Sequence, residues 1–184
     1  MRLIGNWSEG LVIDWHRQYR REDARREGGD DRRTELGEIV YALKFEGSAG
    51  AAASLGKRLS TAIEENLFPR SLIISIPGAP KRSWQPSAMI AEALAADLGW
   101  PLCEAVFGKG SSDVETKKLL SFEHRKEFAQ KSLHIVALPA QNRLPILLVD
   151  DVVSTGATFE VACDLLRGAG HANKIFVAAV TRGD

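Results

Sequence analysis

The feature that most constrains the fold is an alternation of apolar runs and helical segments, which is clearest in the final third of the chain. Residues 145–149 form an apolar run typical of a buried strand, residues 157–169 have helical periodicity, and residues 174–181 are again apolar. Strand, helix and strand in this order imply βαβ units, in which a mainly parallel sheet is covered by helices on both faces. We therefore predict an α/β fold.

The same alternation extends through the rest of the chain. Apolar runs predict strands at residues 71–76, 102–107 and 133–137, and a further apolar run lies at residues 39–45. Amphipathic spacing, capping residues and helix-starting proline predict helices at residues 48–66, 86–98 and 121–129. Residues 2–4 and 11–15 predict a short hairpin, and the polar residues 108–118 predict a loop.

Length and composition fit a single domain of a cytoplasmic protein. The chain has 184 residues, of which 45% are apolar, so it can bury one core. Its formal net charge is zero, and we therefore do not expect nucleic acid as a partner. Cys103 and Cys163 lie far apart in apolar stretches and are expected to be free thiols. The sequence has neither a secretory signal pattern nor an apolar run long enough to span a membrane, so we expect no membrane partner.

The segment Ile146 to Thr158 has the strongest chemical signal. Four apolar residues precede Asp150 and Asp151, and after two valines the chain continues as Ser154, Thr155, Gly156, Ala157 and Thr158. A loop of small residues before a helix presents free N–H groups and a partial positive charge to a phosphate. Gly156 allows the backbone to approach that anion closely. The two carboxylates suit ribose hydroxyls or a hydrated Mg2+.

This segment resembles the 5-phosphoribosyl-1-pyrophosphate (PRPP) signature of type I phosphoribosyltransferases. The resemblance implies the fold of that family, with Mg2+ as cofactor and PRPP as ligand. It also implies that residues 154–158 hold the ribose 5-phosphate, and that Asp150 and Asp151 face the ribose 2- and 3-hydroxyls as catalytic residues with an indirect part in metal binding.

Two other interpretations of short motifs do not fit the sequence. Leu148 to Asp151 also resembles the first strand of response-regulator receivers, but only 33 residues follow Asp151, where such a domain needs roughly a hundred. Residues 50–57 resemble a nucleotide P-loop, but Arg58 stands where that motif requires Ser or Thr, and we predict an amphipathic helix there.

Cations elsewhere in the chain match the order of the family's other loops. Lys81 and Arg82 follow the strand at residues 71–76, where the resemblance implies a pyrophosphate-binding loop. Lys109, Lys117 and Arg125 lie where the family has a flexible loop that closes over PRPP, and they are candidate contacts. Solvated loops explain these residues as well, and both interpretations stay open at this point.

Within the superfamily, the chain is most similar to competence protein ComF and its amidophosphoribosyltransferase-like relatives. Residues 41–47, Tyr-Ala-Leu-Lys-Phe-Glu-Gly, resemble the Leu-Lys-Tyr-x-Gly pattern before the first helix of those proteins. Two features depart from ComF: residues 82–86 replace its Arg-Gly-Phe-Asn stretch, and its N-terminal zinc-type cysteines are absent.

The resemblance also implies how the domain, residues 1–184, is divided. We expect residues 36–184 to form the PRPP-binding core. Residues 1–35, in which seven arginines nearly balance six acidic residues from residue 16 on, would form a small hood with a charged insertion. Trp7, Trp15, His16 and Tyr19 could stack on an acceptor base from this hood, or could simply be buried.

These observations predict an enzyme that transfers phosphoribosyl from PRPP to an amine or nucleobase and releases pyrophosphate. Ser154 stands where 6-oxopurine phosphoribosyltransferases have an aspartate, which argues against hypoxanthine or guanine as the acceptor. The alternative is a non-catalytic PRPP-binding regulator or a ComF-like accessory protein of DNA uptake. The sequence does not name the acceptor, and a homodimer is left open.

Overall fold

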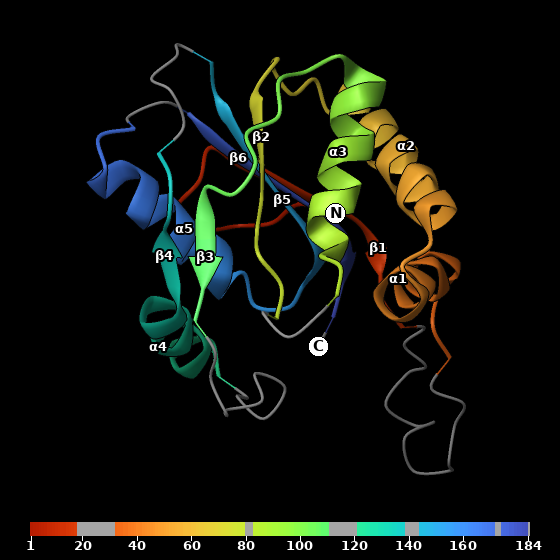
Figure 1. The fold of residues 1–184 in the computed structure, drawn as a ribbon, viewed down its shortest axis with the longest axis horizontal. Helices are drawn as coiled ribbons and strands as arrows, with labels where there is room; N and C mark the ends of the chain where they lie inside the picture. The colour runs from red at the N-terminus through yellow and green to blue at the C-terminus, as the bar shows by residue number, and fades with distance from the viewer. Residues whose placement is uncertain (18–31, 80–82, 111–120, 139–143, 172–173, 184) are drawn as a thin grey trace.

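The computed structural model describes residues 1–17, 32–79, 83–110, 121–138, 144–171 and 174–183. Its centre is a sheet of four parallel strands. Across the sheet these are β1 (Glu9–Trp15), β6 (Ile175–Arg182), β5 (Ile146–Val153) and β2 (Leu72–Ser75). All four strands run in the same direction, so their carboxyl ends lie at one edge of the sheet, the lower edge in Figure 1. This is the edge at which open α/β sheets bind ligands.

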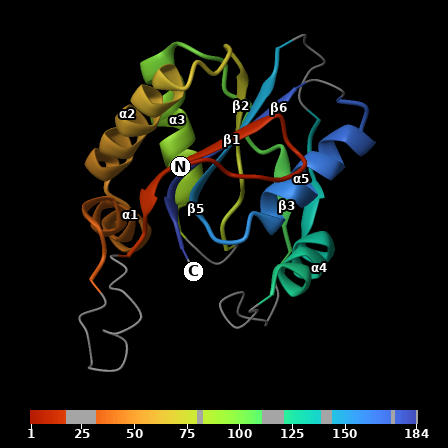
Figure 2. The ribbon, with the colours of Figure 1, turned by 180° about the vertical axis from the view of Figure 1, so that it is seen from behind.

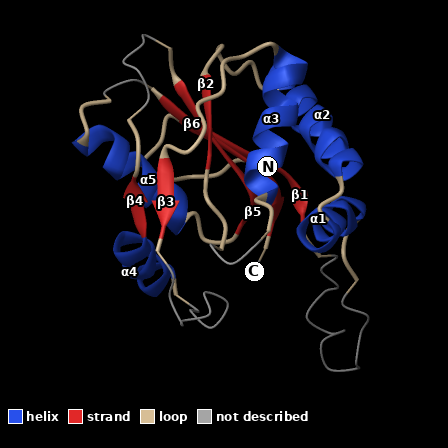
Figure 3. Cartoon of the chain, viewed as in Figure 1, coloured by secondary structure: helices blue, strands red, loops and turns tan. Residues whose placement is uncertain are grey.

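Helices cover both faces of the sheet. Figures 1 and 2 show α1 (Glu35–Glu46), α2 (Ala49–Glu65) and α3 (Pro86–Leu98) on one side, and α5 (Ala157–Gly168) on the other. Alternate residues of β5 supply the two cores: Leu147 and Val149 pack with the first group of helices, and Ile146 and Leu148 pack with α5. The strands therefore lie between two helical layers (Figure 3), which confirms the predicted α/β fold class.

The helices begin and end at residues that the sequence marks for this purpose. Ser48 accepts a hydrogen bond from the N–H of Ala51 at the start of α2, and α3 has proline in its first turn and the left-handed Gly99 after its end. These two helices confirm the predictions for residues 48–66 and 86–98, and with them the prediction that residues 50–57 are helical. The apolar run at residues 39–45 is the body of α1.

A second, smaller sheet lies on the α5 side of the molecule. It pairs β3 (Phe107–Lys109) with β4 (Leu133–Ile135) in antiparallel fashion, and α4 (Phe122–Ser132) precedes β4. The predicted strand at residues 102–107 is wrong for most of its length, because Ala105 adopts a left-handed backbone (φ 53°) that interrupts it. Only a single bridge, Ile73 to Leu102, remains of the expected pairing.

The N-terminal segment belongs to the central sheet rather than to a separate layer. Of the predicted hairpin, the structure has one antiparallel bridge, which joins Arg2 to Leu11. Strand β1 instead pairs in parallel with β6 over its whole length. Its apolar residues Val12 and Leu11 are buried in the two cores, one on each face of the sheet. Residues 9–15 thus lie in the central sheet. The division of the chain into a hood at residues 1–35 and a core at residues 36–184 stays a prediction, and residues 18–31 lie outside the described part of the chain.

Strand β5 is longer than its apolar run predicts. The expected strand ends at Val149, whereas the observed ladder with β6 continues through Asp150↔Ala179 to Val153↔Arg182. The correction follows from the neighbouring strand, which supplies backbone partners that the apolar pattern of β5 does not reveal. Among the described helices, none is long and apolar enough to cross a membrane. Both cysteines are free thiols, as predicted.

Candidate functional site

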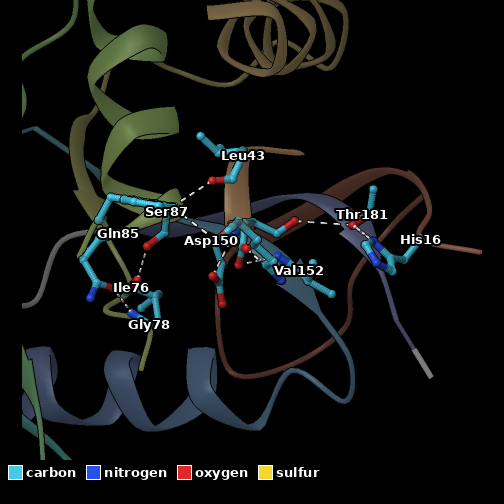
Figure 4. Close-up of polar contacts among 12 residues, drawn as sticks. His16, Leu43, Ile76, Gly78, Gln85, Ser87, Asp150, Val152 and Thr181 are labelled. Atoms are coloured by element: carbon cyan, nitrogen blue, oxygen red, sulfur yellow. Dashed lines mark hydrogen bonds and ion pairs between the residues drawn. The ribbon is translucent and has the colours of Figure 1, made fainter. Parts of the chain in front are cut away.

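The candidate site lies at the carboxyl edge of the sheet, where four segments of the chain meet. They are the end of β5, the loop from β5 into α5, the loop after β2, and the last turn of α1. Figure 4 shows Asp150 in the middle of this group, with the contacts of the β2 loop on one side and those between β6 and His16 on the other. The parallel topology thus brings together polar groups from distant parts of the sequence.

The loop of residues 154–158, which we call the phosphate loop, leads directly into the N-terminus of α5. Gly156 is the N-cap residue with φ 85°, a left-handed conformation that favours glycine. A Cβ at this position would lie 3.2 Å from Cη2 of Trp7. The N-cap makes no side-chain hydrogen bond to the helix, and N–H groups in a first turn have no partner within the helix. The loop can therefore donate backbone hydrogen bonds to an anion.

Asp150 and Asp151, which we call the acid pair, lie inside the last part of β5. The Oδ1 of Asp150 accepts the N–H of Asp151 at 2.8 Å, and the Oδ1 of Asp151 accepts the N–H of Val152 at 2.9 Å. The other oxygen of Asp151, Oδ2, lies 2.8 Å from Nζ of Lys44 in α1. Each carboxylate is therefore fixed by the backbone, and Asp151 also has a cationic partner.

The two carboxyl groups of the acid pair differ in how readily they lose a proton. Burial raises the pKa of Asp150 well above its usual value, and the negative charge of Asp151 raises it further. Burial also opposes ionisation of Asp151, but the Lys44 ammonium and the hydrogen bonds to this carboxylate outweigh it and lower its pKa. In the absence of a ligand, Asp151 is thus the member that holds the negative charge.

Lys44 is held in place by a contact at the end of its own helix. The indole N–H of Trp84 donates to the carbonyl oxygens of Leu43 (2.9 Å) and Lys44 (3.2 Å), which belong to the last turn of α1. Gly47 ends the helix with φ 64°, and a Cβ there would lie 3.0 Å from Cδ2 of Trp84. The Trp84 side chain therefore fits closely against the end of α1.

The loop after β2 is braced by one glutamine. Gln85 accepts the N–H of Gly78 through Oε1 (2.9 Å) and donates from Nε2 to the carbonyl of Ala79 (3.2 Å). Ser87 of α3 also donates to the carbonyl of Ile76. The predicted pyrophosphate contacts, Lys81 and Arg82, lie between these residues but outside the described part of the chain, and their role stays a prediction.

His16 follows β1 and completes the polar group on the far side of the acid pair. Its Nδ1 lies 3.1 Å from the Oγ1 of Thr181, which in turn contacts the carbonyl of Asp151 at 3.5 Å. Partial burial lowers the pKa of His16, and the nearby Lys44 ammonium lowers it further. His16 is therefore a neutral imidazole near neutral pH.

Two of the three candidates for a loop that closes over the ligand lie in described elements. Lys109 is the last residue of β3, and Arg125 lies in α4. Lys126 beside it forms an ion pair with Glu160 of α5 (2.8 Å), so α4 is tied to the helix that follows the phosphate loop. Lys117 lies outside the described residues. A contact of these cations with PRPP stays a prediction.

The sequence did not predict the residues that contact or support the acid pair from distant parts of the chain. Lys44 lies in the segment that resembles the ComF pattern, but nothing in that pattern indicates an aspartate as its partner. Trp84 and Gln85 lie in the stretch that departs from ComF. The departure of this stretch from ComF was the signal in the sequence that could have pointed to Trp84 and Gln85, because a changed loop is held by different side chains.

The donor set fits a Mg2+ that is bound mainly by a ligand. Among the described residues, no three His, Cys, Asp or Glu side chains cluster in a way that could hold a metal. One oxygen of Asp151 is already compensated by Lys44. Mg2+ usually keeps several waters and binds through one or two carboxylates together with substrate phosphates. Asp150 and Asp151 would hold it in this indirect way, and their role in metal binding stays a prediction.

Known proteins resemble the chain only in structure. No family model matches the sequence, and no curated protein matches it. Similar solved structures include the xanthine-guanine-hypoxanthine phosphoribosyltransferase of Helicobacter pylori (15% identity, TM-score 0.49, 74% of this chain and 76% of that chain). Adenine phosphoribosyltransferase from Trypanosoma brucei, in complex with AMP, pyrophosphate and ribose-5-phosphate, has 15% identity and a TM-score of 0.48 over 84% of this chain and 59% of that chain.

A hypothetical protein from Neisseria gonorrhoeae with bound ppGpp is also similar, with 17% identity and a TM-score of 0.45 over 72% of this chain and 68% of that chain. Similarity at this level does not assign an activity, because one fold carries many functions. The function must therefore follow from the residues of the site.

Proposed function

We propose that the protein is a phosphoribosyltransferase: it binds PRPP together with Mg2+ and transfers the phosphoribosyl group to an amine or nucleobase, releasing pyrophosphate. One observation carries this proposal. A loop of small residues with a left-handed glycine at a helix N-terminus directly follows a pair of partly buried carboxylates on the same strand end. The sequence of that segment resembles the PRPP signature, and its geometry suits both halves of the ligand.

The phosphate loop would bind the 5-phosphate. Backbone N–H groups at the start of α5 point toward the loop and carry the positive end of the helix dipole. Gly156 gives the loop its left-handed turn at the N-cap, and Ser154, Thr155 and Thr158 carry hydroxyl groups that could donate to the phosphate. Ala157 contributes its backbone N–H, which at 3.4 Å from Oγ1 of Thr155 is only weakly engaged in the free protein.

The acid pair would bind the ribose. Carboxylate oxygens are strong acceptors for hydroxyl groups, and a charged acceptor strengthens such a hydrogen bond. Because Asp150 and Asp151 are fixed by backbone N–H groups, they can meet the two ribose hydroxyls without losing side-chain freedom. The negative charge of the pair, which Asp151 holds, would also stabilise the positive charge that develops at ribose C1.

The loop after β2 would bind the leaving group. Gln85 holds the adjacent backbone groups of Gly78 and Ala79, which precede Lys81 and Arg82 in the sequence. The two cations would supply charge to the pyrophosphate. In the reaction the bond from C1 to pyrophosphate breaks and a bond from C1 to the acceptor nitrogen forms, and the acceptor loses a proton.

Mg2+ bound with PRPP would neutralise charge on the pyrophosphate as it leaves. The residues of this chain contribute positioning and electrostatic stabilisation, and the proposal assigns no covalent step to them. Ser154 would make no acid–base contribution near neutral pH, which disfavours hypoxanthine and guanine as acceptors. We place the enzyme in the cytoplasm and leave the acceptor unassigned.

A second candidate function is PRPP binding without catalysis, as a regulator or a ComF-like accessory protein of DNA uptake. The resemblance of residues 41–47 to the ComF pattern favours it. Exchange of labelled pyrophosphate into PRPP, measured with a panel of amines and nucleobases, separates the two. Exchange or product formation supports the enzyme, and PRPP binding without either supports the regulator.

Thermal unfolding with and without the metal tests the proposed ligand. Because a ligand that binds only the folded state stabilises it by mass action, PRPP at about a hundred times its Kd should add about 2.7 kcal/mol to the free energy of unfolding. We expect this gain only when Mg2+ is present. Equal stabilisation without the metal would remove Mg2+ from the proposal, and no stabilisation under either condition would remove PRPP.

A further inference from the structure

The ion pair between Lys44 and Asp151 differs from the other lysine–carboxylate contact on the same face of the sheet. Its side chains are 21% and 13% exposed, whereas those of Lys57 and Asp97, which lie on α2 and α3, are 68% and 28% exposed. A lysine in the last turn of a helix usually extends into solvent and is favoured there by the helix dipole. Lys44 instead turns inward to the end of β5, where its ammonium is partly desolvated.

We infer that Lys44 is a positioning residue of the candidate site, which fixes Asp151 and, through it, the acid pair that faces the ribose. The inference rests on the proposed function and deepens it. Lys44 acts through Asp151 and makes no contact with the reacting atoms in this assignment, so it is not a catalytic residue.

Geometry supports a chain of contacts from Lys44 through Asp151 to Asp150. Asp151 uses Oδ1 for the N–H of Val152 and Oδ2 for the ion pair with Lys44. Asp150 uses Oδ1 for the N–H of Asp151, and the two side chains also hydrogen-bond to each other. The position of Asp151 therefore helps to set the position of Asp150.

Trp84 extends this arrangement to the loop after β2. Its indole N–H holds the carbonyls of Leu43 and Lys44, and the next residue, Gln85, holds Gly78 and Ala79. The segment that orients Lys44 is therefore the segment that braces the proposed pyrophosphate loop. Binding at that loop and the position of the acid pair are coupled through two adjacent side chains.

The test compares ligands that differ only in the ribose. Affinities for inorganic phosphate and ribose 5-phosphate are measured by calorimetry on the full chain, for wild type and for Lys44→Met, Lys44→Arg and Trp84→Phe. We expect Lys44→Met to lower the affinity for ribose 5-phosphate by about tenfold to a hundredfold, which is the effect of losing a hydrogen bond to a charged group. The affinity for inorganic phosphate should stay unchanged. Lys44→Arg should restore most of the loss, and Trp84→Phe should show part of it.

Two controls separate positioning from general stability. Lys57→Met removes a lysine from an exposed ion pair on the same face and should leave both affinities unchanged. If Lys44→Met does not fold, because Asp151 is left without its cation, Trp84→Phe carries the test, since it leaves the ion pair in place and removes the contact that holds the end of α1. In that variant, weakened ribose 5-phosphate binding with normal phosphate binding supports the inference, and an unchanged preference for ribose 5-phosphate overturns it.

The outcomes also separate this inference from the proposed function. If wild type binds ribose 5-phosphate no better than inorganic phosphate, there is no ribose site, and the proposed function fails together with the inference. If wild type prefers ribose 5-phosphate and a folded Lys44→Met keeps that preference, only the role of Lys44 is overturned. An equal loss for both ligands in Lys44→Met would also overturn it, because Lys44 would then support the fold and not the ribose.

Discussion

The phosphate loop and the acid pair are neighbours in the sequence, but they depend on the rest of the chain to different degrees. The loop is made by the backbone: a left-handed glycine and the start of α5 orient its N–H groups. The acid pair is made by side chains, and its charge is compensated by Lys44 from a helix near the other end of the sequence. The conformation of the loop follows from local sequence, whereas the contacts of the acid pair exist only after the sheet and α1 have packed.

The largest effect in this comparison is expected at Gly156. Gly156→Val forces a branched side chain into a left-handed backbone 3.2 Å from Trp7, and so distorts the N-cap of the helix whose N–H groups would hold the phosphate. We expect binding of inorganic phosphate and ribose 5-phosphate to fall at least about a hundredfold, and the free energy of unfolding to fall by about 1–2 kcal/mol. Calorimetric titration and chemical denaturation measure the two effects.

Gly170→Val is the matched control for this change. Gly170 has φ 88°, and a Cβ there would meet nothing within 4 Å. It should therefore cost similar stability through backbone strain while leaving phosphate binding intact. If both variants bind phosphate as the wild type does, residues 154–158 are only the start of a helix, and their assignment as a phosphate-binding loop is wrong.

The acid pair should show the next largest effect, and it should depend on the ribose. Replacing both members with asparagine (Asp150→Asn and Asp151→Asn) removes the charged acceptors. We expect affinity for ribose 5-phosphate and PRPP to fall by about tenfold to a hundredfold. Inorganic phosphate should bind as before, because the loop that holds it is unchanged. Titration with all three ligands measures the difference.

Asp97→Asn serves as the control for the acid pair, because Asp97 is also an aspartate beside a lysine but lies away from the sheet edge. It should leave all three affinities unchanged. A double variant of the acid pair that folds and still prefers ribose 5-phosphate over phosphate would contradict the assignment of these carboxylates to the ribose.

The same comparison explains what could be predicted from sequence. The α/β class, helices α2, α3 and α5, and the β5–loop–α5 unit were predictable because each depends on local periodicity, caps and glycine. The edge position of β1 and the extra length of β5 were not, because both result from pairing with β6. Lys44 could not be assigned for the same reason: its partner is set by how α1 packs.

Thr158 in the first turn of α5 should show a smaller effect, limited to the ligand. Thr158→Ala removes one hydroxyl donor. We expect the affinities for ribose 5-phosphate and inorganic phosphate to fall equally, by about tenfold. If Thr158 only supported the helix start, the variant would instead lower stability by about 1 kcal/mol without affecting the ligands. Calorimetry and thermal unfolding of the same sample distinguish the two.

Thr61→Ala is the matched variant, because Thr61 is a helical threonine on the surface of α2 that donates to the carbonyl of Lys57. It should change neither affinity. Normal ligand binding by Thr158→Ala would remove the hydroxyl from the phosphate loop and leave the backbone as its main donor.

The smallest expected effect is a pH dependence that reports the charge around the acid pair. Burial lowers the pKa of His16 below 6.5, and the cations of Lys44, Arg33 and Arg17 lower it further, against the opposing charge of Asp151. The unfolded chain therefore takes up a proton at a higher pH than the folded chain. Stability from this group is fully present above the unfolded pKa of about 6.5, and it declines as the pH falls from there to the folded pKa.

Urea denaturation between about pH 7.5 and about pH 5.5 measures this slope. We expect His16→Asn to make the slope shallower than in wild type, while His124→Asn, at an exposed position on α4, leaves it unchanged. Lys44→Met should also make the slope shallower, because removing that cation lets the pKa of His16 move back toward its usual value. Gly156→Val should not, because the phosphate loop does not set the charge around His16. A slope that responds to Gly156→Val but not to Lys44→Met would mean that the two regions are not independent in the way the structure indicates.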